Sequence, residues 1–580
     1  MSGSLLTSQA EEQVALWRDY WSSRWHHPVL WPKHRLSCFI TAELARNDVS
    51  DNGDPLVSDF PRGRRPFLGI LTNSGSGGTS PVSGALEYND DGHLLTIAPT
   101  RSGKGAAQII PNLLLYAGSC LVIDIKGENH KVTHKHRQTF FDGASVLKFA
   151  PFDDDTNHYN PLDFIRVKED GSPSSYTFDD ARLLSEMLVG SRANETFWDI
   201  EARNLLTMLL LYVATRYQPG HYDRVMGRVV ELLFPVLSPD DDDTTSPFVK
   251  TTDAIKLWAD QCNDKILGAM VTQSIEHEDK VRAGILSTCR SAMSIWLSER
   301  LQNATQESDF RFSDLKRSMC RPENDDPAPT TLYVMIPAEY LKEYRSVLRM
   351  IVGLAAVEMT RSNDWSDPAH VEAGWRTKPP CPVLFLLDEF PSLGHMAPIE
   401  QGMAYLAGYG VQIWTFAQSL GQLKEIYKEN WSTFVSNAGA SCYFGMADPD
   451  ICDFLSQQLG KTGEYAMRYF TASGSQSYTL GSSSSDTSGS SRNHSWGSGG
   501  GGMGNTVGTS DGTSASESRS KTFAEQIRYK DDPVATSSDL RAMPQGSQIV
   551  LLRHKLPAIA SLLPFYECEL FTSLYDTWRP

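Results

Sequence analysis

Short apolar segments without alternation, each followed by polar or helix-like sequence, constrain the fold of this chain more than any other feature. Continuous hydrophobicity is typical of strands that are buried on both faces, as in a parallel sheet between helices. Some of these segments come early in the chain, and the others follow after a long interval. We therefore expect an α/β fold. The expected strands are Leu94–Ala98, Cys120–Ile125, Val146–Ala150, Leu332–Ile336, Val383–Leu387, Gln412–Ala417, Ser441–Met446 and Gln548–Arg553.

The interval between the two groups of strands has a helical pattern. Within residues 176–325 apolar side chains recur at three- and four-residue spacing, for example in 197–217 and 281–301. Strand signals are almost absent there. We expect an all-α domain inserted into the α/β domain, which then comprises residues 66–175 and 326–580.

Two further segments have an unusual composition. Residues 1–65 are rich in tryptophan, and Trp17, Trp21 and Trp25 recur every four residues. They would share one face of a helix that either packs on the body or docks a partner or a membrane surface. Residues 472–516 are dominated by Ser, Gly and Thr. We expect a flexible loop there, because such a segment buries too little apolar surface to offset its chain entropy.

Composition and charge exclude several classes of protein. Of the 580 residues 40% are hydrophobic, which excludes wholesale disorder. No apolar run approaches the roughly 20 residues that cross a bilayer, and no signal pattern opens the chain, so we expect a cytoplasmic protein. The 53 basic and 70 acidic residues give a net charge of −17. That charge disfavours an external coat of nucleic acid but is compatible with a basic groove or pore.

A candidate phosphate-binding loop follows the first expected strand. The sequence APTRSGKG, residues 98–105, precedes a helix-like segment, which is the strand–loop–helix context that such a loop needs. Backbone N–H groups would face the phosphates, and Lys104 would add a positive charge. Ala98 replaces the usual first glycine and Gly105 the usual hydroxyl ligand of Mg²⁺, so on its own this segment is also compatible with a plain turn. The expected nucleotide-binding residues are Thr100, Arg101, Ser102, Gly103, Lys104 and Gly105.

Polar side chains end two later strands and complete the expected site. Asp388 and Glu389 follow Val383–Leu387, where Asp388 could hold Mg²⁺ and Glu389 could polarise the attacking water. Gln418 follows Gln412–Ala417 and could sense the γ-phosphate of ATP or orient the water, or it could simply open the next helix. Asp124 also ends a strand, where it could support the site or form a charged turn.

In combination, these segments resemble the coupling-protein ATPases of type IV secretion, the TraG-like conjugative ATPases. The resemblance extends over roughly residues 85–565. It depends on several segments in order rather than on any single one. They are TIAPTRSGKG at 96–105, IPNLL at 110–114, DIKGE at 124–128, NPLDFI at 160–165, FW at 197–198, AGIL at 283–286 with Trp296, SDF at 308–310, LDEFP at 387–391 and AQ at 417–418.

The resemblance implies a RecA-like P-loop domain, interrupted by an all-helical docking domain, that assembles as a homo-hexameric ring. It implies hydrolysis of ATP with Mg²⁺, with Lys104, Glu389 and Gln418 catalytic and Asp388 at the metal. Such a ring feeds single-stranded DNA with its relaxase, or effector proteins, into a secretion channel. An arginine finger supplied by a neighbouring subunit is expected as well, for which Arg349 and Arg553 are the candidates.

Family members usually carry N-terminal membrane helices, and this sequence shows none. We therefore expect the protein to reach the membrane secretion complex through a partner, either in the cytoplasm or peripherally at the inner face of the membrane. Translocation of single-stranded DNA or nucleoprotein is the leading hypothesis for function. The alternatives are a receptor ATPase for effector proteins and a low-turnover, ATP-binding assembly component of a mobile-element or defence system.

Overall fold

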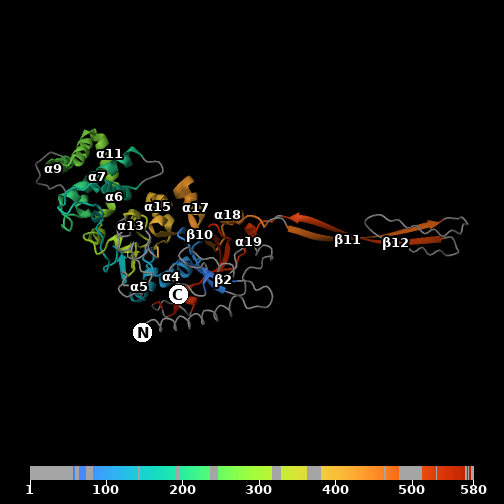
Figure 1. The fold of residues 1–580 in the computed structure, drawn as a ribbon. Helices are drawn as coiled ribbons and strands as arrows, with labels where there is room; N and C mark the ends of the chain where they lie inside the picture. Colours follow the sequence, from blue (N-terminus) through green and yellow to red (C-terminus); the bar gives the residue numbers. More distant parts are fainter. Residues whose placement is uncertain are drawn as a thin grey trace, which may run out of the picture.

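The computed structural model consists of an α/β domain, a helical domain and a long two-stranded ribbon (Figure 1). The helical domain and the ribbon project from opposite sides of the α/β domain. Most of the Trp-rich N-terminal segment lies outside the described residues. Those residues are 57–58, 65–72, 83–140, 144–190, 196–235, 246–316, 328–361, 381–462, 465–482, 513–530, 532–568, 571–572 and 574–575.

Parallel strands form the centre of the α/β domain. In the described part of the chain twelve strands share one sheet, in the order β1-β3-β2-β14-β13-β10-β4-β9-β8-β5-β7-β6. From β10 to β6 every pair is parallel, as the uninterrupted apolar runs predict. These strands are β10 (Ala438–Phe444), β4 (His93–Ile97), β9 (Val411–Ala417), β8 (Val383–Leu387), β5 (Cys120–Ile123), β7 (Thr330–Val334) and β6 (Ser145–Phe149).

The other end of the sheet is antiparallel. The expected strand near the C-terminus is present as β13 (Ser547–Leu552), but it pairs antiparallel with β10, so its placement in a parallel sheet is wrong. Hydrophobicity reports the burial of a strand and carries no information about its direction. The remaining strands had no counterpart in the sequence analysis. They are β14 (Ala558–Ser561), β2 (Phe67–Thr72), β3 (Ser83–Glu87) and β1 (Val57–Ser58).

Helices connect and cover the parallel strands. The segment after β4 begins as the π-helical turn η1 (Gly105–Ile109) and continues as α4 (Ile110–Leu115), while α5 (Glu128–Phe140) follows β5. The longest helix of this domain is α13 (Arg345–Thr360), which begins after β7. The shorter ones are η5 (Phe390–Leu393), α15 (Ala397–Gly402), η6 (Leu406–Tyr409), α16 (Leu420–Tyr427), η7 (Lys428–Trp431), α17 (Ser432–Ser436), α18 (Pro449–Leu459), α19 (Ser537–Arg541) and η8 (Phe565–Glu567).

The inserted domain is helical, and within its described residues no strand occurs between α6 and η4. Its central helix α7 starts with a capping box between Thr196 and Asp199. Most of the surface of α7 is apolar, which allows α6, α10 and α11 to pack around it. The expected α/β fold with an inserted helical domain is therefore confirmed, while its exact boundaries stay predictions. The elements are η2 (Pro161–Phe164), α6 (Thr177–Val189), α7 (Phe197–Arg216), α8 (Met226–Leu233), α9 (Pro247–Cys262), α10 (Lys265–Glu276), α11 (Asp279–Met293), η3 (Ser294–Leu297), α12 (Glu299–Ala304) and η4 (Phe312–Lys316).

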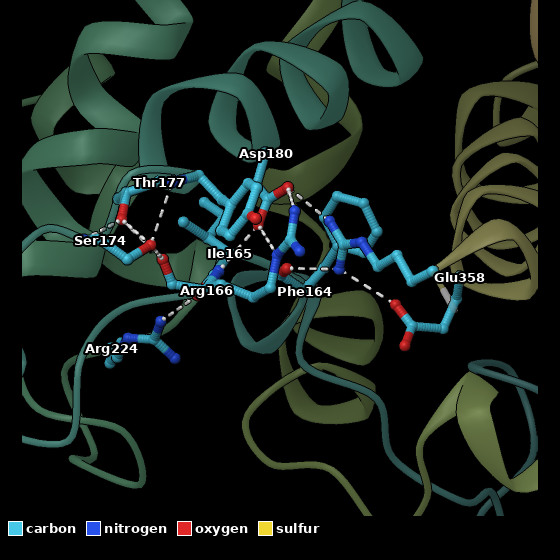
Figure 2. A network of polar contacts seen from close by, with 10 residues as sticks. Phe164, Ile165, Arg166, Ser174, Thr177, Asp180, Arg224 and Glu358 are labelled. Atoms are coloured by element: carbon cyan, nitrogen blue, oxygen red, sulfur yellow. Dashed lines mark hydrogen bonds and ion pairs between the residues drawn. The ribbon is translucent and has the colours of Figure 1, made fainter. Parts of the chain in front are cut away.

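A buried carboxylate joins the two domains (Figure 2). Asp180 on α6 is 1% exposed and accepts hydrogen bonds from Arg166 Nε at 2.8 Å and from the guanidinium of Arg361, at the end of α13. Arg361 also donates to Glu358 at 3.0 Å and lies 3.8 Å above the ring of Phe164. Because a buried carboxylate needs paired charges, this cluster fixes the base of the helical domain to α13.

The ribbon consists of β11 (Tyr465–Ser482) and β12 (Thr513–Lys530), which pair antiparallel along their whole length. Residues 472–482 and 513–516 are therefore strands, and the prediction of a flexible loop is wrong for them. That prediction considered only apolar burial, whereas backbone hydrogen bonds between two chain segments can order residues of any composition. Residues 483–512 lie outside the described part. Among the helices that the structure describes, none is long and apolar enough to cross a bilayer.

Candidate nucleotide site

Four loops converge where the parallel strands end. The register pairs Ile97 with Ala417, Thr415 with Leu387, and Leu387 with Ile123, so β4, β9, β8 and β5 end at the same edge of the sheet. The carboxyl ends of parallel strands are where α/β proteins bind their ligands. The expected phosphate loop and the polar residues after β8 and β9 thus lie together, as the sequence analysis predicts.

The loop at residues 98–105 curls tightly after β4. Arg101 and Gly103 have positive φ of 62° and 95°, and the Ser102 hydroxyl donates to the Pro99 carbonyl at 2.6 Å. The Ala107 N–H donates to Gly103 O at 2.8 Å, so helical hydrogen bonding begins inside the loop. Backbone turned in this way makes its N–H groups converge on a concave surface that suits an anion.

Lys104 lies at the centre of the loop and is 8% exposed. Its Nζ donates to the carbonyl of Ala98 at 2.7 Å and to that of Pro99 at 3.2 Å. Burial lowers the pKa of the Lys104 ammonium, and the nearby carboxylates of Glu389 and Asp388 oppose that shift. The ammonium therefore binds the backbone of the loop and is close enough to the acidic pair to interact with its charge.

The acidic pair follows directly on β8, whose residues are all buried. Burial raises the pKa of Asp388 to about 6; the adjacent Glu389 raises it further, whereas Lys104 opposes the rise. Glu389 has φ of 48°, in the left-handed region that non-glycine residues rarely adopt. This turn directs two successive carboxylates to the same edge, where a cation would relieve the cost of their burial.

Gln418 connects the loop to the acidic pair. Its Nε2 donates to Glu389 Oε2 at 2.8 Å, and its Oε1 accepts from the Thr100 hydroxyl at 2.9 Å. The backbone N–H of Gln418 donates to Gln422 Oε1 at 3.0 Å. Three residues from separate segments of the sequence therefore form one hydrogen-bonded chain.

The sequence profile of one family, described as type IV secretory system conjugative DNA transfer, matches residues 49–494. The chain belongs to this family. It is 27% identical over 385 residues to the protein VirD4 of Agrobacterium fabrum, an alignment that covers 65% of this chain and 50% of VirD4. It is 25% identical over 384 residues to the conjugal transfer protein TraG of Escherichia coli, covering 65% of this chain and 56% of TraG. The chain thus spans about half the length of these relatives.

Solved structures of the bacterial conjugative coupling protein TrwB share the fold of this family member. A sulphate complex of TrwBdeltaN70 has a TM-score of 0.53 at 14% identity and covers 90% of this chain and 93% of its own. TrwB in complex with ADP and Mg²⁺ has a TM-score of 0.52 at 13% identity and covers 91% and 93%. The likeness confirms the RecA-like P-loop fold with its helical domain.

Three other residues that the sequence analysis singled out lie apart from the hydrogen-bonded chain. Arg349 donates through Nε to the Met187 carbonyl at 2.8 Å and through Nη2 to the Leu188 carbonyl at 3.3 Å, so it binds the end of α6. Arg553 is exposed and follows β13 at the opposite edge of the sheet. Asp124 accepts from the His130 N–H at 2.8 Å and holds the first turn of α5. The arginine finger stays a prediction.

Other residues support the loop and were missed. Gly445 follows β10 with φ of 63°, and a Cβ there would lie 3.1 Å from Ser102 Cβ, so a side chain at this position would strain the backbone and crowd the loop. Beneath the loop, buried Thr96 donates to Gln108 Oε1 at 2.8 Å and accepts from Trp414 Nε1 at 2.9 Å. The sequence gave no signal of the contacts of Gly445 with Ser102 and of Thr96 with Trp414, because in each pair the two residues are more than 300 positions apart.

Proposed function

We propose that this family member is an ATPase that couples hydrolysis of ATP to the transfer of single-stranded DNA, with its bound relaxase, through a type IV secretion system. The observation that carries the proposal is the hydrogen-bonded convergence of the loop, Gln418 and Glu389 at one edge of a RecA-like sheet. The relatives VirD4 and TraG and the ADP and Mg²⁺ complex of TrwB support it.

The residues present fit a nucleotide with its metal. Backbone N–H groups of residues 101–105 would hold phosphate oxygens, and Lys104 would exchange two carbonyl partners for them. Asp388 would bind Mg²⁺ directly or through water, and the cation would oppose the burial that raises the pKa of Asp388 to about 6. When bound, Mg²⁺ neutralises charge that develops on the phosphates.

The protein's own side chains would then act on the water. Glu389 accepts its proton as the general base, while Gln418 keeps Glu389 in place and senses the γ-phosphate. We propose a homo-hexameric ring in which a neighbouring subunit supplies an arginine. Arg553 is exposed and therefore accessible to a neighbouring subunit, whereas the donors of Arg349 already bind α6. The ring would work in the cytoplasm, peripheral to the membrane, where a partner connects it to the secretion complex.

The test is the steady-state rate of ATP hydrolysis across a titration of single-stranded DNA. We expect the rate to rise with DNA, the rise to weaken with salt, and Lys104→Ala to abolish hydrolysis. Lys256→Ala, at an exposed position on α9, serves as the matched control with full activity. Hydrolysis that depends on Lys104 but ignores DNA would exclude a DNA motor.

That second outcome would favour a receptor ATPase for effector proteins. The observation behind this alternative is an exposed aromatic and apolar cluster at the start of α7, formed by Phe197, Trp198 and Ile200. A single helical surface of this kind suits a protein cargo better than a nucleic acid backbone, which requires positive charge.

Gly105 offers a separate prediction about the metal. A Cβ at Gly105 would meet no atom within 4 Å, so a threonine hydroxyl fits at the position where related loops bind Mg²⁺. Gly105→Thr is expected to lower the Mg²⁺ concentration for half-maximal hydrolysis by roughly threefold, because it adds an oxygen ligand. Gly105→Ala controls for the added carbon. An equal response of both variants, or a weaker response to Mg²⁺ in the threonine variant, would contradict this role.

A further inference from the structure

The Thr100 hydroxyl makes a contact that binding of phosphate does not explain. It donates at 2.9 Å to Oε1 of Gln418, and the same amide donates through Nε2 at 2.8 Å to Glu389 Oε2. Thr100 belongs to the loop, Gln418 follows β9 and Glu389 follows β8. A single side-chain amide therefore links the phosphate loop to the candidate general base.

The chemistry of the amide makes this chain directional. A carboxylate can only accept, so the NH₂ end of Gln418 must face Glu389 and the carbonyl end must face away from it. The carbonyl end then needs a donor, and the Thr100 hydroxyl supplies one. A flipped amide would place its oxygen against the carboxylate and lose the hydrogen bond to Glu389. The carboxylate of Glu389 thus selects the orientation of the Gln418 amide, and the Thr100 hydroxyl holds the amide in place from its carbonyl end.

The geometry of Glu389 explains why its hydrogen bond with Gln418 matters for the proposed reaction. Its backbone is already in the left-handed region, with φ of 48°, and its N–H donates to Asp388 Oδ1 at 3.0 Å. The Gln418 amide fixes Oε2, which leaves Oε1 to accept a proton. A general base that is oriented by a third group, here through its other carboxylate oxygen, is the usual arrangement for activating a nucleophile.

We propose that Thr100 is a positioning residue for Glu389 that acts through the Gln418 amide. The inference deepens the proposed function and rests on it. It assigns to Thr100 a role in turnover that is separate from any contact with phosphate, and it makes the conformation of the loop a condition for the placement of the base.

The experiment measures kcat and KM for ATP in Thr100→Val, Thr100→Ser, Gln418→Ala and the double variant Thr100→Val with Gln418→Ala. Valine keeps the shape of threonine and removes the donor. We expect Thr100→Val to lower kcat about tenfold with KM within about twofold, because the lost interaction acts on the reacting base. Thr100→Ser, which retains the donor, should recover most of the turnover. The double variant should match Gln418→Ala, since both residues act as one chain.

Several results would overturn the proposal. A raised KM with unchanged kcat in Thr100→Val would show a phosphate contact, and losses that multiply in the double variant would show that the two residues act independently. A serine variant as slow as the valine variant would exclude the hydroxyl as the cause. Lys104→Ala distinguishes failure of the proposed site from failure of the positioning role. If Lys104→Ala still hydrolyses ATP, the proposed site is wrong as a whole. If Lys104→Ala is inactive and Thr100→Val has normal kinetics, only the positioning role is wrong.

Discussion

Glu389→Gln is expected to lower the rate of ATP hydrolysis by on the order of 10³-fold while ATP binding persists. The replacement removes the carboxylate that we propose as the general base and leaves the backbone of the loop unchanged. The Gln418 amide can still donate to an amide oxygen at position 389, so the hydrogen-bonded chain keeps its geometry. Lys104 retains its place in the loop, because its hydrogen bonds go to backbone carbonyls.

Two measurements check this expectation: a single-turnover hydrolysis rate and the affinity for a non-hydrolysable ATP analogue. Glu425→Gln is the matched control, because Glu425 is exposed on α16, the helix that follows Gln418. This variant should hydrolyse ATP at the normal rate. Normal hydrolysis by Glu389→Gln would refute the assignment of the base. Loss of analogue binding together with hydrolysis would mean that Glu389 maintains the site rather than acting on water.

Arg137→Met is expected to lower the free energy of unfolding by about 3 kcal/mol. Arg137 is buried on α5, and its guanidinium donates to the carbonyls of Leu113 at 3.1 Å, Tyr116 at 2.7 Å and Gly118 at 2.7 Å. The first two carbonyls belong to the end of α4, where the helix can no longer supply donors. Methionine fills a similar volume but leaves these buried acceptors without a partner.

Chemical denaturation of the purified variants measures the effect. Arg182→Met, at an exposed position on α6, is the matched control and should change stability by less than about 0.5 kcal/mol. Arg137→Lys should fall between the two, because one ammonium cannot reach all of the acceptors in the planar pattern of a guanidinium. A stability of Arg137→Met equal to that of the control would contradict the structural role of these hydrogen bonds.

The parallel half of the sheet and the main site could be predicted from the sequence because their signals are local. Each parallel strand has its own apolar run, Asp388 and Gln418 each stand directly after such a run, and the loop that contains Lys104 follows another. Once the strands are parallel, geometry alone brings those residues to one edge. A glycine interrupts β2 and β3, and β14 consists mostly of small residues, so their apolar signals are weak and they were missed.

Features that depend on a partner elsewhere in the chain could not be predicted. The hydrogen bond between Thr100 and Gln418 joins side chains 318 residues apart, and the sequence around neither residue predicts it. The ribbon of β11 and β12 depends on pairing between two polar segments that look unstructured when each is taken alone. The antiparallel direction of β13 likewise depends on β10.

The strand order also determines when this site can come into existence during synthesis. The loop stands on β4, whose two neighbours are β9 and β10, and these begin only at Val411 and Ala438. The helical domain and several other strands must therefore emerge from the ribosome before β4 gains either neighbour. A nascent chain therefore carries the complete phosphate-loop sequence without the sheet edge that gives it shape until Val411 has been synthesised. Binding of nucleotide to this loop therefore does not assist the early steps of folding. The helical domain can form first, because its helices mainly contact one another.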